Sequence, residues 1–294
     1  MSTLTSVTPH PLLPDDGTSP SGGDRTIALD HLTVTAPGAG QDAVLLEGVS
    51  VTLSEARTAV IGENGSGKST LARAIAALVP AASGTVTVHG VDAAQDVKAL
   101  RRILGMVFAN PAAQSIMPTV REDVELTVNA LRDPAGRKLG KTEVAARVQA
   151  ALAEHRLTEL ADRPCLSLSS GQAQRLAMCS VMVGQPQVVI ADEPTSLLDG
   201  RHRRIVAERL FGGAGCGEFQ LLLVTHDLEL ARDCDEAVWI HEGRLRAHGP
   251  AAQVVGEYER FLEEEFAGEA ADVRGEQAAP AVGEGRGGGE EPSS

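Results

Sequence analysis

The chain has 294 residues, 43% of them hydrophobic, and a formal net charge of −14, a balance that argues against a general nucleic-acid binder. Its longest apolar runs, such as Ala74–Val79, are far shorter than the roughly 18 residues that span a bilayer. The start lacks a secretory pattern and the four cysteines are widely spaced, so we expect neither an integral membrane or exported protein nor a disulfide framework.

In chain order, the first segment is Met1–Asp24, which is rich in Ser, Thr, Pro and Gly, and we expect it to be a disordered leader. Residues 25–266 form the expected folded domain, and the acidic, Gly-rich residues 267–294 an expected disordered tail. The expected strands are Ile27–Val34, Val49–Leu53, Thr58–Ile61, Gly84–Val88, Leu104–Phe108, Gln187–Ala191, Gln220–Val224 and Ala237–His241. The expected helices are Lys68–Leu78, Val120–Leu131, Lys141–Glu154, Ser170–Val183, Arg201–Leu210, Leu228–Arg232 and Ala251–Phe266.

This alternation of strands and helices is typical of an α/β fold with a largely parallel sheet. The stretch from Val120 to Val183 is helical throughout and lies between two core strands. We therefore expect a helical subdomain over about residues 112–183, inserted into the sheet domain.

A complete G-x-x-x-x-G-K-[ST] pattern, Gly62–Ser69, follows the apolar run Thr58–Ile61 and precedes a helix. Its glycines let backbone N–H groups surround phosphates, and the helix adds the positive end of its dipole. Lys68 is expected to reach the β- and γ-phosphates and Ser69 to bind Mg²⁺. A chance Gly-rich turn is the alternative, which the strand–loop–helix order disfavours. The predicted nucleotide-binding residues here are Gly62, Asn64, Gly65, Ser66, Gly67, Lys68, Ser69 and Thr70.

Two acids end a later apolar strand, Val188–Ala191. Asp192 stands at the carboxyl end of that strand, where open α/β sheets bind ligands, and is expected to hold Mg²⁺. Glu193 is expected to polarise the attacking water as a general base. An apolar strand that ends in two acids is common, so this prediction depends on the phosphate-binding loop upstream.

The segment Ser169–Gln172 begins the helix Ser170–Val183. Hydroxyl residues and a glycine at a helix start form an anion site as well as a cap. Taken alone, an ordinary serine N-cap is the better interpretation, and the surrounding motifs make the anion site the better one here.

These motifs, followed by Ser196–Asp199 and Thr225–Asp227, resemble those of an ABC-type ATPase subunit over about Thr26–Gly249. The resemblance implies a P-loop NTPase (RecA-like) core with a mostly parallel sheet, an antiparallel β part and the inserted helical subdomain. It also implies ATP and Mg²⁺ as cofactors and ATP hydrolysis as the activity.

In that family the signature motif binds the γ-phosphate of an ATP held by the P-loop of a second ATPase subunit, so that two subunits enclose two ATP molecules. The resemblance assigns this role to Ser169, Ser170, Gly171 and Gln172. It implies that Asp199 lies in the loop that crosses the interface. It further implies that His226 contacts the γ-phosphate and, with Glu193, orients the water.

A narrower resemblance is carried by Gly105–Pro111, Gln114 and Pro118–Val124, which are similar to ATPases of energy-coupling-factor importers of vitamins and metals. Leu197–Arg204 is similar to biotin-importer ATPases. The resemblance implies a second ATPase subunit, a transmembrane coupling protein and a membrane substrate-binding component as partners. It implies a peripheral position on the cytoplasmic face of the cell membrane and no nucleic-acid partner.

Two positions depart from the family pattern. Ala109 stands where the family has the glutamine that touches Mg²⁺ and water, and Gln114 is a weak candidate to replace it through a loop shift. The segment Leu32–Pro37 lacks the aromatic residue on which the family stacks adenine, a contact worth about 1–3 kcal/mol in related nucleic-acid settings.

Two other classes remain as alternatives. A soluble ABC ATPase of DNA repair or translation usually carries coiled coils, zinc modules or two ATPase domains, and the sequence shows none of these. A P-loop kinase would lack the signature motif and His226. The sequence therefore favours an importer ATPase and leaves its cargo, and the choice between homodimer and heterodimer, open.

Overall fold

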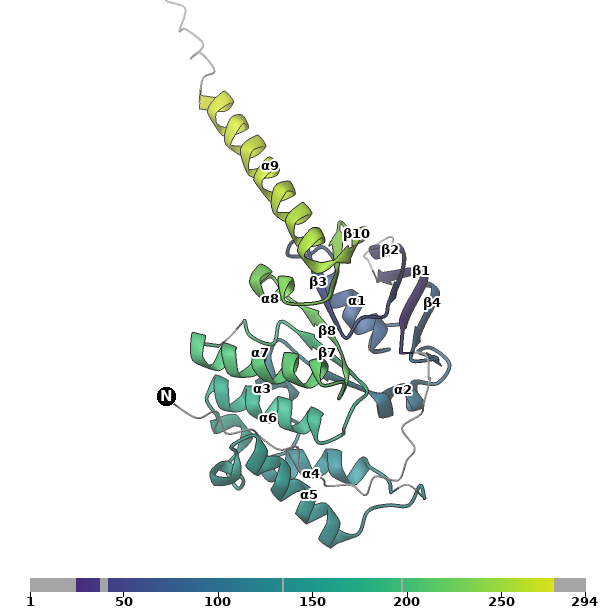
Figure 1. Cartoon of the computed structure of the whole chain (residues 1–294), viewed down its shortest axis with the longest axis vertical. Coiled ribbons are helices and arrows are strands. Elements are labelled where there is room, and N and C mark those ends of the chain that lie inside the picture. The colour runs from purple at the N-terminus through teal and green to yellow at the C-terminus, as the bar shows by residue number, and fades with distance from the viewer. Residues whose placement is uncertain (1–24, 38–41, 134, 197, 278–294) are drawn as a thin grey trace, which may run out of the picture.

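The computed structural model describes residues 25–37, 42–133, 135–196 and 198–277 (Figure 1). The expected leader over 1–24 and residues 278–294 of the expected tail lie outside the described residues. None of the described helices is both long enough and apolar enough to cross a bilayer.

The strands form two sheets that share one body. A four-stranded antiparallel sheet has the order β2-β1-β4-β5, and a six-stranded sheet has the order β10-β9-β3-β8-β7-β6. The smaller sheet consists of β1 (Ile27–Ala36), β2 (Ala43–Leu53), β4 (Ser83–Val88) and β5 (Val91–Asp92). The larger consists of β3 (Arg57–Ile61), β6 (Leu104–Val107), β7 (Val188–Asp192), β8 (Gln220–Val224), β9 (Glu236–His241) and β10 (Arg244–Pro250).

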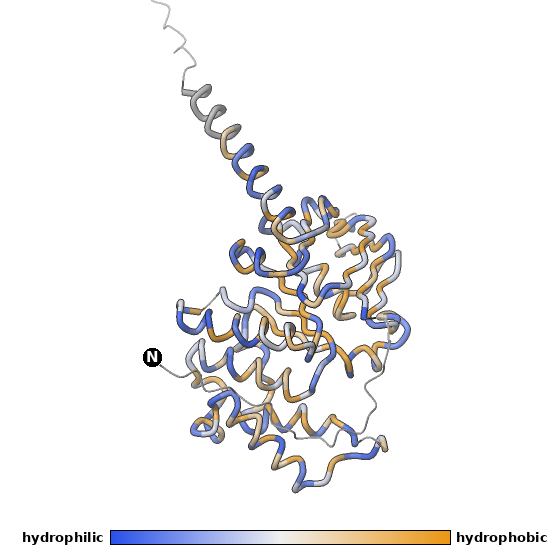
Figure 2. Tube along the Cα trace, in the orientation of Figure 1, coloured by the Kyte–Doolittle hydropathy of each residue, from blue (hydrophilic) through white to orange (hydrophobic). Residues whose placement is uncertain are grey.

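Within the larger sheet all strands run parallel except the edge strand β10, which pairs antiparallel with β9. Every residue of β7 and β8 is buried, as expected for parallel strands covered on both faces. Figure 2 shows hydrophobic segments concentrated inside the body. The predicted α/β class, with a mostly parallel sheet and an antiparallel part, is confirmed.

The helices of the described chain lie around these sheets (Figure 1). They are α1 (Lys68–Ile75), α2 (Val97–Ile103), α3 (Pro111–Gln114), α4 (Val120–Ala130), α5 (Lys141–Glu154), α6 (Ser170–Met182), α7 (Gly200–Gly215), α8 (Leu228–Arg232) and α9 (Ala251–Gln277). The helices α3 to α6 follow one another between β6 and β7. Buried side chains of α4 and α5, with Leu176 and Cys179 of α6, form a core cluster separate from those of the sheets. Met178 and Met182 of α6 belong to the core cluster of the larger sheet, so α6 joins this helical layer to that sheet.

Several elements differ from the sequence-based expectations. The strands β5 and β10, the short helices α2 and α3, and the first half of β2 were not expected, because they are short or lie at a sheet edge. The expected tail is wrong over 267–277, since α9 continues to Gln277 and projects from the body (Figure 1). Residues 267–277 are mostly helix formers such as Ala, Glu and Arg, and Pro280 is the first proline beyond them.

The sheet order places three loops side by side. In the larger sheet β3, β8 and β7 are neighbours and run in the same direction, so their carboxyl ends meet at one edge. The phosphate-binding loop follows β3, Asp192 ends β7, and Thr225–Asp227 follows β8. The fold thus gathers residues that are far apart in the sequence.

Candidate functional site

The segment Gly62–Gly67 forms a tight loop between β3 and α1. Gly62 and Gly67 have φ values of 144° and 108°, in the region that favours glycine. A Cβ atom at Gly62 would lie 2.1 Å from the Ile240 carbonyl oxygen, and one at Gly67 would lie 2.8 Å from the Leu46 side chain. The neighbouring strands therefore pack so closely against this loop that only glycine fits at these two positions.

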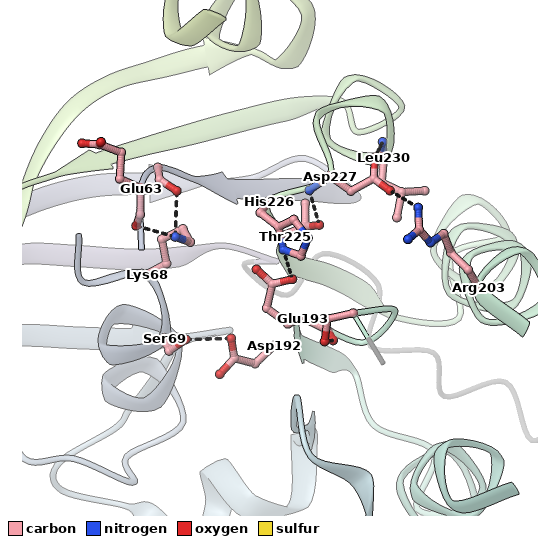
Figure 3. Close-up of polar contacts among 12 residues, drawn as sticks. Glu63, Lys68, Ser69, Asp192, Glu193, Arg203, Thr225, His226, Asp227 and Leu230 are labelled. Carbon is pink, nitrogen blue, oxygen red and sulfur yellow. Dashed lines mark hydrogen bonds and ion pairs between the residues drawn. The ribbon is translucent and has the colours of Figure 1, made fainter. Parts of the chain in front are cut away.

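Lys68 is buried at the first position of α1, with 7% of its surface exposed. Its Nζ donates hydrogen bonds of 2.7 Å to the carbonyl oxygens of Gly62 and Glu63 (Figure 3). Burial lowers the pKa of Lys68, and the nearby carboxylates, Glu193 first among them, oppose that shift. An ammonium held by two neutral carbonyls in a buried loop is suited to an anionic ligand.

Ser66 adds a second donor to the same loop. Its Oγ is buried and has no hydrogen-bond partner among the described residues. Buried hydroxyls are normally paired, so this one fits a missing acceptor such as a phosphate oxygen. The loop thus fits the triphosphate of a nucleotide.

Ser69 and Asp192 form the pair predicted to hold the metal. The Ser69 Oγ donates to the Asp192 Oδ1 at 2.9 Å, and Asp192 is 2% exposed at the end of β7 (Figure 3). Among the described residues no group of three or more His, Cys, Asp or Glu side chains is placed to hold a metal ion. Mg²⁺ commonly takes one or two carboxylates together with substrate phosphates, so this hydroxyl and carboxylate fit Mg²⁺ bound with a nucleotide.

Glu193 and His226 contact each other directly. The His226 Nδ1 and the Glu193 Oε2 lie 2.7 Å apart, a hydrogen bond that the ring donates, because a carboxylate only accepts (Figure 3). The Glu193 side chain is 18% exposed and that of His226 63%. Glu193 has a φ of 51°, and its N–H donates to the Val224 carbonyl at 2.9 Å, which fixes the turn after β7 beside β8.

A cavity of about 620 Å³ lies against the phosphate-binding loop and Glu193, and neither Asp192 nor His226 lines it. Of the predicted residues, those that line it are Asn64, Gly65, Gly67, Lys68, Ser69, Thr70 and Glu193. A larger cavity of about 730 Å³ between α2 and α4 is lined by none of the predicted residues. The smaller cavity is therefore identified as the site by the residues that line it and not by its volume.

Four residues of this cavity were not predicted from the sequence: Val44, Leu45, Glu242 and Gly243. They come from the start of β2 and the turn between β9 and β10. The turn packs closely against β2, since a Cβ at Gly243 would lie 2.8 Å from the Leu45 carbonyl oxygen. All aromatic residues of the chain are among the described residues and none lines this cavity, so the lack of an aromatic partner for the base extends beyond Leu32–Pro37.

The signature segment lies outside this cavity. Ser169 and Gln172 form a capping box at the start of α6: the Ser169 Oγ accepts from the Gln172 N–H, and the Gln172 Oε1 accepts from the Ser169 N–H. Asp199 caps α7 in a similar way and also lies outside the cavity. Hydrogen bonds of the single chain join Ser69 to Asp192 and Glu193 to His226. The side-chain hydrogen bonds of Ser169, Gln172 and Asp199 stay within the starts of their own helices.

Gln114 is engaged with its own surroundings. Its side-chain amide accepts from the Phe108 N–H at 3.1 Å and donates to the Met106 carbonyl at 3.3 Å. The side chain thus closes the turn that contains Ala109, at the end of β6, and does not line the phosphate cavity.

Comparison with known proteins identifies the family. Residues 46–196 match the ABC transporter family. The chain is 40% identical over 215 residues to the biotin transport ATP-binding protein BioM of Rhizobium etli, a match that covers 73% of this chain and 91% of the relative. It is 34% identical to the energy-coupling factor transporter ATP-binding protein EcfA1 of Lactiplantibacillus plantarum, over 78% of this chain and 80% of the relative.

A solved structure gives the same result at the level of the fold. The structure of cbiO1 from Clostridium perfringens, described as part of the ABC transporter complex cbiONQ, has a TM-score of 0.66 and 27% identity, over 83% of this chain and 95% of that one. The chain therefore belongs to the ABC transporter family and is an ATP-binding subunit of the energy-coupling-factor type.

Proposed function

We propose that this chain hydrolyses ATP to drive an energy-coupling-factor importer for a vitamin or a metal ion. The observation that carries the proposal is the meeting of Lys68, the Ser69–Asp192 pair and the Glu193–His226 pair at one edge of the sheet. The first pair joins the start of α1 to the end of β7, and the second joins the turn after β7 to the loop after β8. Such convergence is what hydrolysis of a bound nucleotide requires and is not needed to stabilise the fold.

Each side chain has a distinct task in this proposal. Lys68 leaves the two loop carbonyls and neutralises the phosphates, a change that its burial favours. Ser69 and Asp192 hold Mg²⁺, which when bound neutralises charge that develops on the phosphate oxygens. Glu193 accepts a proton from the attacking water, and His226 keeps the Glu193 carboxylate in place through their 2.7 Å hydrogen bond.

The signature segment and Asp199 act on a second ATPase subunit in this proposal. Both begin a helix, where free N–H groups favour an anion, and neither lies at this chain's own cavity. A partner's ATP would supply that anion. The subunit would be a second copy of this chain or a related ATPase.

The cargo and the membrane partners are the finer part of the proposal. Biotin is the preferred cargo, since relatives in Rhizobium etli and Rhodobacter capsulatus are biotin transport ATP-binding proteins. The chain would sit on the cytoplasmic face of the cell membrane, bound to a transmembrane coupling protein and a substrate-binding component. Uptake of labelled biotin and of Co²⁺ is measured in cells that lack this chain and in the same cells after the chain is expressed again. The uptake that is lost and then restored identifies the cargo as a vitamin or a metal ion.

The hydrolytic role is tested by Glu193→Gln, which keeps the shape of the side chain and removes the base. ATP binding is expected to stay within about twofold, while turnover falls by about 10²-fold or more. Glu208→Gln, at an exposed glutamate that pairs with Arg204 on α7, is the matched control and should leave turnover unchanged. Near-normal hydrolysis by Glu193→Gln would show that Glu193 is not the general base.

A further inference from the structure

The first turns of α6 and α7 are joined by one side chain, His202. Its imidazole lies over the backbone of Gly171, the glycine of the signature segment. A Cβ atom at Gly171 would lie 2.9 Å from the His202 Cδ2 and 3.1 Å from its Nε2, too close for any residue but glycine unless the ring moved. The ring therefore occupies the space that the glycine leaves.

The other side of the same ring faces Asp199. The His202 Nδ1 lies 2.9 Å from the Asp199 Oδ2 and 3.0 Å from its Oδ1. Since a carboxylate only accepts, Nδ1 carries the proton in this contact. The backbone and ring bonds from His202 together lower the pKa of Asp199.

Helix capping alone does not require this ring. The Asp199 Oδ1 already accepts from the His202 backbone N–H at 3.0 Å, which completes an ordinary N-cap. The residue that closes a capping box from this position is usually Glu or Gln, whose side chain reaches back to the backbone. The His202 side chain bonds instead to the Asp199 carboxylate and packs on a different helix.

Asp199 is also linked back to Glu193 through a short series of turns. The Ser196 Oγ donates to the Glu193 carbonyl at 3.1 Å, and the Leu198 N–H donates to the Thr195 carbonyl at 3.2 Å. Thr195 and Leu198 are buried, with 4% and 9% of their surfaces exposed. Ser196 is thus bound to Glu193, and Leu198, the residue before Asp199, is bound to Thr195.

We propose that His202 is a positioning residue that holds the signature segment and the Asp199 loop as one unit, so that a shift of α6 moves the segment that follows Glu193. This rests on the proposed function, which places Gly171 and Asp199 against the ATP of a second subunit. In this arrangement, binding of the partner's ATP changes the position of Glu193 in this chain, and the ring of His202 transmits that change.

Three variants of the full-length chain separate the two contacts. His202→Ala removes both contacts, His202→Asn keeps a donor for Asp199 without the ring, and His202→Phe keeps the ring without the donor. Turnover is measured on the assembled ATPase, with its second subunit where that differs from this chain. Arg204→Ala, on the next turn of the same helix with its side chain 82% exposed, is the matched control.

We expect His202→Ala to lower kcat about tenfold, the scale of one lost hydrogen bond to a charged group, and to leave the ATP Kd of the isolated chain within twofold. His202→Asn and His202→Phe should each restore part of that loss. In a double-mutant cycle, Asp199→Ala should cost less turnover when His202 is already alanine than in the wild type.

Two results would overturn the inference. One is a His202→Ala variant with wild-type kcat, and the other is a loss that appears equally in kcat, in ATP Kd and in the unfolding temperature, which indicates a purely structural role. Failure of the proposed function looks different, because then the wild-type chain itself neither binds nor hydrolyses ATP.

Discussion

Asp123 on α4 offers a test of how the helical layer is attached to the segment that follows β6. This carboxylate is 6% exposed and accepts three hydrogen bonds. Its Oδ1 accepts from the N–H groups of Ile116 and Met117 at 2.8 and 3.2 Å, and its Oδ2 accepts from the Ser180 hydroxyl at 2.9 Å. One side chain thus joins the stretch after α3 to both α4 and α6.

The cost of Asp123→Ala follows from which partners water can reach. Hydrogen bonds to a charged group are worth about 1.5–3 kcal/mol each, and a donor left buried without a partner loses most of that. Ile116 is an exposed residue, whereas Met117 and Ser180 are half-buried, so we expect water to replace only part of what the carboxylate supplies. We expect a total loss of about 2–3 kcal/mol, and about 1 kcal/mol for Asp123→Asn, which keeps an acceptor.

Thermal unfolding followed by circular dichroism measures this difference. For a domain of this size, 2–3 kcal/mol corresponds to a fall in Tm of about 5–10 °C. Asp162→Ala is the control. The Asp162 carboxylate is 86% exposed and, in the described part of the chain, pairs with Arg121 alone, so its loss should stay below about 0.5 kcal/mol. If Asp123→Ala lowers Tm no more than Asp162→Ala does, the carboxylate does not hold these segments together.

Three further predictions follow from the site and the fold. Lys68→Ala should weaken ATP binding by at least about 100-fold in an equilibrium titration, because the phosphates lose their buried cation, while an unchanged circular dichroism spectrum shows that the fold is intact. Ala109→Gln should change turnover more in the assembled complex than in the isolated chain, because the added amide reaches the site only when a membrane partner holds its loop; an equal change in both preparations would contradict this. Asp235 accepts two hydrogen bonds from Arg57, at 2.6 and 2.9 Å, which keep the pKa of Asp235 below its usual value. The pair therefore stabilises the fold above about pH 4 and loses this effect as the pH falls further, so Asp235→Asn should cost about 1 kcal/mol at pH 7, after screening by solvent, and progressively less in acid.

The sequence predicted the phosphate-binding half of the site because its chemistry is local. A glycine loop between a strand and a helix, and acids at a strand end, can be identified without knowing the rest of the fold. Their meeting also followed from the sequence, because parallel strands end at the same edge of a sheet. The role of His226 could not be predicted from local sequence patterns and came only from the family resemblance.

The residues that sequence reasoning missed all depend on packing between distant segments. Val44 and Glu242 reach the cavity because the β9–β10 turn presses on β2. Asp123 reads in the sequence as an acid in the first turn of a helix, and nothing local indicates that it binds the backbone of Ile116 and Met117. Gln114 has a similar explanation, because only the fold shows its amide on the backbone of β6 and the residue that follows it.

The left-handed backbone of Glu193 has a consequence for the evolution of this chain. A residue with a Cβ atom held at a φ of 51° carries a conformational cost of about 1 kcal/mol, which glycine avoids and asparagine partly avoids. In the proposed mechanism, a population selected for heat resistance alone would accumulate glycine or asparagine at position 193 and lose its general base. The same proposal implies that selection for turnover retains the glutamate, so the residue found at this position in laboratory-evolved lineages would indicate which property was under selection.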